Sequence, residues 1–199
     1  MIKLKNIELT LNKNSTQENK IFSNFNLEVN TGKWTVIVGS NGAGKSTLMN
    51  LIAGDLIPDS GSVIIGSQDM THLSCHQRAK SISRVFQDPN AGTFAELTVE
   101  ENLCIAKSRG EKRSLKLALN SSQREALREQ LLKFNIGLEN KLDNAIGTLS
   151  GGQRQVISLL MCTMQPAKIL LLDEHTAALD PSISEKVMAA TEYLITQHK

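Results

Sequence analysis

The stretch WTVIVGSNGAGKSTLMNLIAG, residues 34–54, decides the fold, because an apolar run leads into a glycine-rich loop and then into a helical pattern. The loop fits G-x-x-x-x-G-K-[ST], in which glycines let consecutive backbone N–H groups point inward at an anion. The N-terminus of a following helix adds partial positive charge. We therefore predict a buried strand at residues 34–38, a phosphate-binding loop, and a helix at residues 46–53 that ends at Gly54.

The loop itself, called the phosphate loop below, supplies the candidate nucleotide-binding residues. They are Gly39, Ser40, Asn41, Gly42, Ala43, Gly44, Lys45, Ser46 and Thr47. We expect Lys45 to neutralise the β- and γ-phosphates of a nucleotide and Ser46 to ligate Mg²⁺. An ordinary glycine turn is the alternative interpretation, and the strand–loop–helix context argues against it.

A second apolar run, residues 169–172, ends in two carboxylates, Asp173 and Glu174. The end of such a strand is where a phosphate-loop enzyme places its second Mg²⁺ contact, and the next glutamate can take a proton from water. Acidic residues also favour turns, so an acidic loop at a strand end is the competing interpretation. The phosphate loop favours the catalytic one.

The sequence LSGGQ, residues 149–153, stands directly before a helical pattern. Ser150 has the side chain of an N-cap residue, and Gly151 and Gly152 allow a backbone to come close to an anion. These residues, the signature turn below, form our third candidate element.

The remaining patterns set the fold class. Alternating apolar residues at 2–11 and 25–29 predict an antiparallel β-layer. Helical spacing appears at residues 98–106, 121–134 and 153–164, with a charged connection at 107–116. The sequence therefore predicts an α/β core interrupted by a mostly helical insert.

In chain order, GSNGAGKST, VFQ at residues 85–87, LSGGQ, ILLLDE and ALD together resemble the ATP-binding subunit of ABC transporters. The resemblance implies an α/β P-loop NTPase (RecA-like) core with an N-terminal antiparallel β-layer and a helical subdomain insert. It also implies a single ABC ATPase domain over residues 1–199. Within it, residues 1–88 and 156–199 form the core and residues 89–155 the helical subdomain.

The same resemblance assigns ATP and Mg²⁺ as cofactors and gives roles to individual residues. Gln87 matches the glutamine that touches Mg²⁺ and links the nucleotide to the transmembrane partner. Ser46, Gln87 and Asp173 are expected to hold the metal, while Glu174 polarises the attacking water. Glu174 and Gln87 are therefore the catalytic candidates.

A head-to-tail homodimer is implied as well. Ser150, Gly151, Gly152 and Gln153 are expected to bind the γ-phosphate of ATP held by the other subunit. Asp180 matches the aspartate that crosses the dimer interface.

The implied partners are integral-membrane permease subunits, with this chain peripheral on the cytoplasmic side of the cell membrane. FQDPNAGT at residues 86–93 and DEHTAALDP at 173–181 are similar to an importer-like subgroup, often paired with a substrate-binding protein for small organic solutes. The net charge of +2 gives no reason to expect nucleic acid. A soluble ABC-type ATPase acting on nucleic acid or the ribosome, and a binding-only nucleotide module, remain the alternatives.

Several positions depart from the family pattern. His175 stands where most of the family has proline, and we interpret it as a loop residue that substitutes for the usual turn. His72, Cys75 and His76 offer a less favoured metal-site interpretation. The family usually stacks an aromatic residue on adenine near residue 11, where this chain has Leu11 and Asn12, so Phe22 is the substitute candidate.

The C-terminal end also departs from the family pattern. His198 lies in a polar tail with no strand before it, so we expect the family's switch histidine beyond residue 199. The resemblance thus implies a C-terminally truncated chain, expected to bind Mg-ATP and turn it over poorly.

Overall fold

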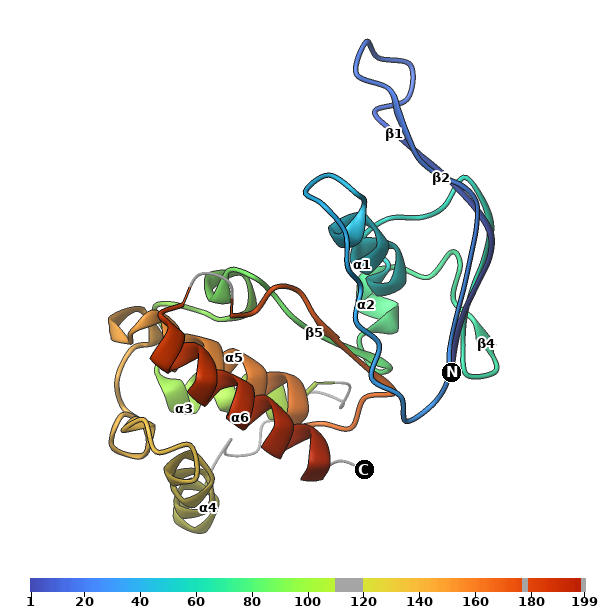
Figure 1. Cartoon of the computed structure of the whole chain (residues 1–199). Helices are drawn as coiled ribbons and strands as arrows, with labels where there is room; N and C mark the ends of the chain where they lie inside the picture. Colours follow the sequence, from blue (N-terminus) through green and yellow to red (C-terminus); the bar gives the residue numbers. More distant parts are fainter. Residues whose placement is uncertain (110–119, 177–178, 198–199) are drawn as a thin grey trace. The chain divides into compact units, whose positions relative to one another are not determined.

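The computed structural model describes residues 1–109, 120–176 and 179–197 (Figure 1). The chain divides into two compact units, Met1–Ala79 and Lys80–Lys199, and each is described by itself. Most of the charged connection expected at residues 107–116 lies outside the described residues.

An antiparallel sheet forms the first unit's β-layer. Its strands are β1 (Ile2–Leu11), β2 (Asn19–Val29), β3 (Ser60–Ile65) and β4 (Gln68–Asp69), in the order β2-β1-β3-β4. Ile2, Leu4, Ile7 and Leu9 of β1 are all buried. The alternation in the sequence therefore predicted this layer correctly, because one face of an antiparallel sheet packs on the core while the other meets water.

Two helices complete the first unit, α1 (Lys45–Ala53) and α2 (Cys75–Arg78). Leu48, Leu51 and Ile52 of α1 are buried, as their spacing predicts. The helix ends at Gly54, which is left-handed (φ 90°) and donates its N–H to the Asn50 carbonyl at 2.9 Å. The predicted helix and its C-terminal glycine are confirmed.

A fully buried arginine, Arg78, closes the C-terminal end of α1. Its Nη1 donates to the carbonyls of Leu51 and Ile52, each at 2.8 Å. Its Nη2 and Nε donate to the carbonyls of Thr71 (3.1 Å) and Leu73 (2.9 Å). Because the last carbonyls of a helix have no partner within it, the guanidinium acts as a buried cap for α1.

The strand predicted at residues 34–38 is wrong. The structure assigns no strand there, and Trp34, Val36 and Val38 are 58%, 81% and 89% exposed. An apolar run indicates that a segment has the composition of a β-strand. A strand forms, however, only where its backbone hydrogen-bonds to another strand. Within this unit, the ladders of β1, β2 and β3 are made with one another.

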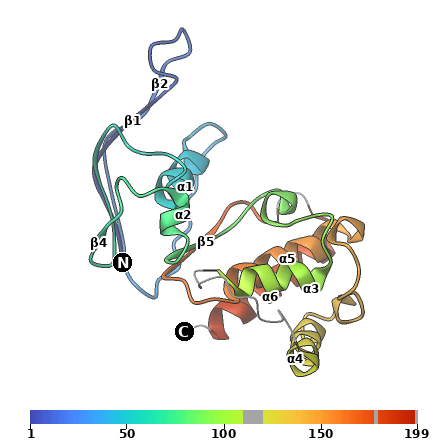
Figure 2. The same cartoon turned by 180° about the vertical axis from the view of Figure 1, so that it is seen from behind.

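The second unit is built on a parallel strand pair. The pair consists of β5 (Ile82–Val85) and β6 (Ile169–Leu172), in register from Ile82 opposite Ile169 to Val85 opposite Leu172. The helices are α3 (Val99–Lys107), α4 (Ser121–Leu132), α5 (Gly151–Thr163) and α6 (Pro181–Gln197). Short 3₁₀ turns lie at Pro89–Gly92, Leu138–Asn140 and Ile146–Thr148. Figure 2 shows α3, α5 and α6 side by side, and the sequence predicted α3, α4, α5 and β6 to within a few residues.

Helix α5 carries the centre of this unit's core. Val156, Ile157, Leu159 and Leu160 are each at most 1% exposed. They belong to one hydrophobic cluster with residues of α3, α4 and α6. The signature turn that precedes α5 therefore rests on the most buried helix of the unit.

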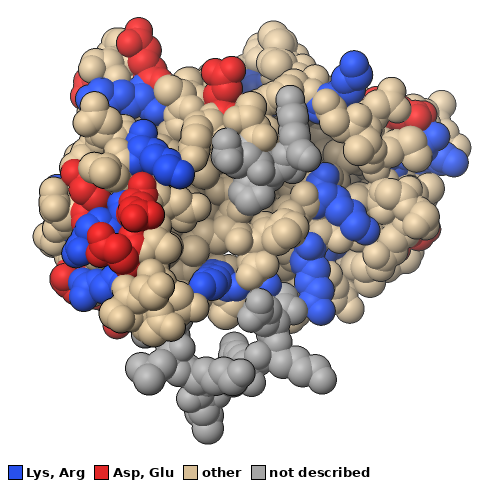
Figure 3. Space-filling view, turned by 90° about the horizontal axis from the view of Figure 1, so that it is seen from below, with Lys and Arg blue, Asp and Glu red and all other residues tan. Residues whose placement is uncertain are grey.

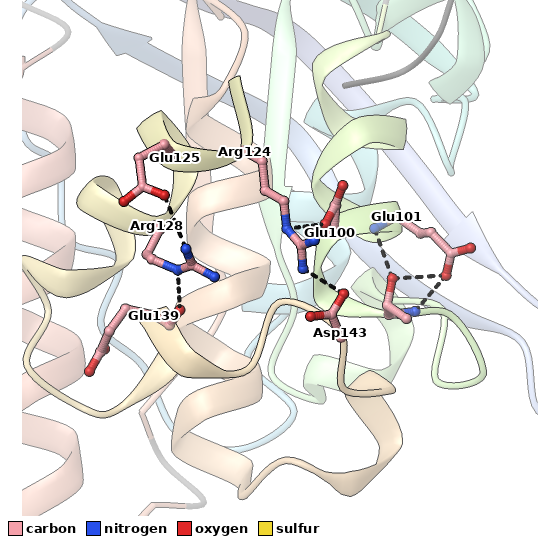
Figure 4. A network of polar contacts seen from close by, with 8 residues as sticks. Glu100, Glu101, Arg124, Glu125, Arg128, Glu139 and Asp143 are labelled. Carbon is pink, nitrogen blue, oxygen red and sulfur yellow. Dashed lines mark hydrogen bonds and ion pairs between the residues drawn. The ribbon is translucent and has the colours of Figure 1, made fainter. Parts of the chain in front are cut away.

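Ion pairs join α4 to its neighbours (Figure 4). Arg124 contacts Glu100 of α3 at 3.0 Å and Asp143 of the following loop at 2.5 Å. The hydrogen bond to Asp143 raises the pKa of Arg124. Arg128 donates to the Glu139 carbonyl at 3.2 Å. These contacts lie at the surface, partly buried or exposed, and are screened by solvent, so they orient α4 more than they stabilise it.

The surface has no dominant sign of charge on the face in Figure 3, where basic and acidic side chains of the described residues are mingled. This agrees with the near balance of 22 basic and 20 acidic residues in the sequence. Among the helices that the structure describes, none has the length and apolarity needed to cross a membrane.

Candidate functional site

The phosphate loop leads directly into α1 through two left-handed glycines. Gly42 has φ 83° and Gly44, the N-cap of α1, has φ 89°. Side chains other than glycine rarely adopt this conformation. The loop therefore curls as the motif predicts and presents the N-terminal amides of α1, which is a ready site for an anion.

Lys45 folds back over this loop. Its Nζ donates to the carbonyls of Gly39 at 2.8 Å and Ser40 at 3.1 Å. Ser46, the next residue, is exposed at the start of α1. An ammonium, a hydroxyl and helix amides thus gather around one loop, and this combination suits a polyphosphate.

The candidate residues for adenine lie in the same unit. Phe22 is 7% exposed and stacks on Phe25 with ring centroids 4.8 Å apart. A Cβ on Gly44 would lie 3.7 Å from the Phe22 ring, so the ring adjoins the phosphate loop. Leu11 is half-buried and Asn12 exposed. That Phe22 receives adenine stays a prediction.

In the second unit, strand pairing brings two of the predicted residues to one edge. The Asp173 N–H donates to the Val85 carbonyl at 3.1 Å, so Asp173 and Gln87 both follow the carboxyl ends of paired strands. Gln155 of α5 donates to the Phe86 carbonyl at 3.3 Å and secures the approach to Gln87, whose own side chain is exposed. Ligands of open α/β sheets bind at this end of the strands.

The carboxylate of Asp173 has a partner that the sequence did not indicate. Arg84 of β5 donates from Nη2 to its Oδ2 at 2.8 Å, and the two side chains are only 12% and 14% exposed. The guanidinium also lies over the Phe86 ring, 4.8 Å from its centroid. The signal in the sequence for this ion pair was Arg84 itself, because a charged residue inside a buried strand usually has a partner.

Glu174 and His175, the next two residues, have opposite environments. Glu174 is exposed and left-handed, with φ 41°. His175 is 9% exposed and lies 3.2 Å from the Thr191 hydroxyl of α6. The loop position of His175 was predicted correctly, but its burial and its hydrogen bond were not.

The remaining histidine predictions concern a metal site at residues 72–76 and the tail residue His198. Within the described residues, no group of three or more histidine, cysteine, aspartate or glutamate side chains could hold a metal ion, and this includes His72, Cys75 and His76. His198 lies outside the described residues.

The signature turn begins α5 as predicted. Ser150 Oγ accepts from the Gln153 N–H, and Gln153 Oε1 accepts from the Ser150 N–H, each at 3.4 Å. Gln153 Oε1 also accepts from Lys141 at 3.1 Å, and its Nε2 donates to the Ile136 carbonyl at 2.8 Å. The Gln153 side chain therefore caps α5 and also hydrogen-bonds to Ile136 and Lys141 of the same chain.

The two glycines of the turn are not equivalent. Gly151 is exposed, and a Cβ there would lie 3.6 Å from Leu179. Gly152 is buried, and a Cβ there would lie 2.0 Å from Cγ2 of Ile183 on α6. The sequence interpretation assigned both glycines to anion binding. It missed that the close packing of α5 against α6 itself requires a glycine at position 152.

Asp180, the last predicted residue, is exposed directly before α6. Its carbonyl accepts from the N–H groups of Ile183 at 3.0 Å and Ser184 at 2.8 Å. That Asp180 crosses a dimer interface stays a prediction.

Known proteins similar to this chain share one family description. A family model described as ABC transporter matches residues 22–177. A tyrosine transport ATP-binding protein of Clostridioides difficile is 39% identical over 198 residues, which cover 99% of this chain and 78% of that protein. The thiamine import ATP-binding protein ThiQ of Shigella sonnei is 38% identical over 175 residues, which cover 88% of this chain and 70% of that protein.

A solved structure is similar as well. The dimeric ATP-binding cassette MJ0796, in a post-hydrolysis state with ADP and Pi, superposes with a TM-score of 0.80 at 27% identity, covering 100% of this chain and 85% of that one. The phosphate loop, the acidic strand end and the signature turn stand in the chain order of this family. This chain therefore belongs to the ABC transporter family, as one of its ATP-binding, ATP-hydrolysing subunits.

Proposed function

We propose that this chain hydrolyses Mg-ATP in a head-to-tail homodimer and thereby drives a permease, to which it binds from the cytoplasmic side of the membrane. The observation that carries the proposal is the phosphate loop, where left-handed Gly44 starts α1 and Lys45 spans the loop carbonyls. A lysine held in this way needs no large rearrangement to meet the β- and γ-phosphates.

Magnesium suits the residues proposed for it. Ser46, Gln87 and Asp173 offer hydroxyl, amide and carboxylate oxygens, the donors that Mg²⁺ prefers. Among the contacts of the described residues, the ion pair with Arg84 engages Oδ2 of Asp173, which leaves Oδ1 for a cation. When bound, Mg²⁺ would offset the negative charge of the phosphates.

Glu174 is the proposed general base. Glu174 is exposed at the end of β6, one residue beyond Asp173, and in this role its carboxylate would orient a water and accept its proton. Its left-handed backbone is uncommon for a residue other than glycine and sets the direction in which Cβ leaves the backbone.

The signature turn and Asp180 are proposed to act on the partner subunit. Ser150 and Gly151 are exposed at the N-terminus of α5, which can bind the γ-phosphate of ATP on the other subunit. We assign Gly152 and Gln153 to support this turn from within the chain, given their contacts with Ile183 and Ile136.

For transport, we propose import of a small organic solute, with a substrate-binding protein in the same system. The support is that the two relatives are named for tyrosine transport and thiamine import. We further propose that the helical segment within residues 89–155 contacts the permease.

Substitution of Glu174 by Gln tests the catalytic assignment. The amide keeps the size of the side chain but accepts no proton, so hydrolysis under single-turnover conditions should fall by about 10²-fold or more. ATP affinity, measured by equilibrium binding, should stay within about threefold because the phosphate loop is unchanged. Size-exclusion chromatography with ATP should show a trapped dimer.

The matched control is Glu192→Gln, which removes an exposed carboxylate from α6 and should leave hydrolysis unchanged. Hydrolysis by the Glu174 variant at the wild-type rate would remove Glu174 from the proposed role.

A further inference from the structure

We propose that His175 is a positioning residue, whose imidazole ties the backbone after Glu174 to α6 through Thr191 and so fixes where the Glu174 carboxylate stands. The inference rests on the proposed function, because it concerns how the general base of that reaction is held.

The hydrogen-bond directions around Thr191 define the contact. The Thr191 hydroxyl donates to the Val187 carbonyl at 2.7 Å. With its proton directed at Val187 in this short bond, the Thr191 oxygen is placed to accept from His175 Nε2, 3.2 Å away. We therefore assign the Nε2–H tautomer to His175, in which the ring donates to Thr191 on α6.

His175 and Thr191 are both buried within the second unit, so their hydrogen bond has little freedom to shift. His175 is 9% exposed and Thr191 only 1%. The contact joins positions 16 residues apart in the chain, so it is tertiary and not a feature of a local turn. A buried polar pair of this kind favours one arrangement over others, because breaking it leaves a donor without water.

A second contact holds the far part of the same loop. The Ser184 hydroxyl near the start of α6 donates to the carbonyls of Thr176 at 3.2 Å and Leu179 at 3.3 Å. Ser184 therefore secures the return into α6, whereas His175 secures the residue that directly follows Glu174.

The conformation of Glu174 explains why such a tie matters. Its φ of 41° is a left-handed value that residues other than glycine rarely adopt, because Cβ then crowds the backbone. A conformation of this kind persists only where the surroundings determine it. The His175 contact is adjacent in the chain, so its loss should let Glu174 relax while the phosphate loop stays intact.

The experiment compares substitutions that remove or keep the hydrogen bond. Thr191→Val removes the acceptor, and His175→Leu removes the donor. Thr191→Ser keeps a hydroxyl, and His175→Gln keeps an amide donor at a similar reach. Thr196→Val is the matched control, since Thr196 on α6 also donates to backbone carbonyls, those of Glu192 and Tyr193.

We expect Thr191→Val and His175→Leu each to lower kcat by about 10- to 100-fold, because a displacement of about 1 Å can cost that much. The KM and the equilibrium ATP affinity should stay within about twofold. Combining both substitutions should add little, since they remove one interaction. Thr191→Ser, His175→Gln and the control should retain most of the activity.

A readout independent of turnover is amide hydrogen exchange at residues 173–176. Exchange there should accelerate in Thr191→Val and not in Thr196→Val. If kcat is unchanged in both Thr191→Val and His175→Leu while Glu174→Gln still abolishes hydrolysis, the positioning role is overturned and the proposed function stands. Parallel losses of kcat, ATP affinity and melting temperature would also overturn it, because they indicate general unfolding. Normal hydrolysis by Glu174→Gln would instead defeat the proposed function itself.

Discussion

The buried cap on α1 leads to a quantitative prediction for Arg78→Met. The substitution keeps the apolar stem but removes the guanidinium that serves the carbonyls of Leu51, Ile52, Thr71 and Leu73. A buried polar group left without a partner costs about 1–3 kcal/mol. At the lower end of that range the four carbonyls lose about 4 kcal/mol together.

Two effects reduce this loss. The methionine avoids the cost of burying a charge, which is several kcal/mol for an isolated ion, and water can reach some of the carbonyls. We therefore expect the free energy of unfolding to fall by about 2–4 kcal/mol. Arg78→Lys should fall between wild type and Arg78→Met, because an ammonium has three donors but lacks the planar fork.

Urea unfolding followed by circular dichroism measures the change, and amide hydrogen exchange at residues 48–53 locates it in α1. Lys80→Met is the control, since it removes an exposed positive charge nearby in the chain. A loss below 1 kcal/mol for Arg78→Met, or unchanged exchange in α1, would refute the assignment of Arg78 as the helix cap.

Two positions in the second unit, Gly152 and Cys162, lead to further predictions. Gly152→Ala should lower the free energy of unfolding by about 1–3 kcal/mol, because its Cβ would lie 2.0 Å from Cγ2 of Ile183. Gly151→Ala, the control, should fold normally. Thermal melting of both variants measures the difference. Burial raises the pKa of the Cys162 thiol to about 11, so iodoacetamide at pH 8 should label exposed Cys75 long before Cys162, as peptide mass spectrometry would show. Above pH 9 the unfolded thiol ionises while the native one stays protonated, so native stability should fall between pH 9 and about 11. This part of the loss should be absent in Cys162→Ala, and equal labelling of both thiols in the native protein would contradict the raised pKa of Cys162.

Local structure followed from the sequence wherever neighbouring residues determine it. Gly44 and Gly54 bound α1 because left-handed backbone favours glycine, and both positions were predicted. Ser150 caps α5 through Gln153, three residues on, which is also a local relation. The β-layer and β6 followed from their apolar patterns.

The strand predicted at residues 34–38 failed for the opposite reason. Its residues have the right composition, but pairing depends on a partner distant in the sequence, and composition does not supply that information. The same limit hid the Arg84–Asp173 ion pair, whose members are 89 residues apart.

The sequence by itself determined the phosphate loop, the acidic strand end, the signature turn and the family to which they belong, because each motif is a short run with its own backbone requirement. The tertiary structure alone decided that Arg78 caps α1, that Gly152 accommodates Ile183, and that His175 is buried within hydrogen-bond distance of Thr191. These roles depend on which side chains meet across the fold. The packing of distant segments sets those meetings, and no local pattern encodes them.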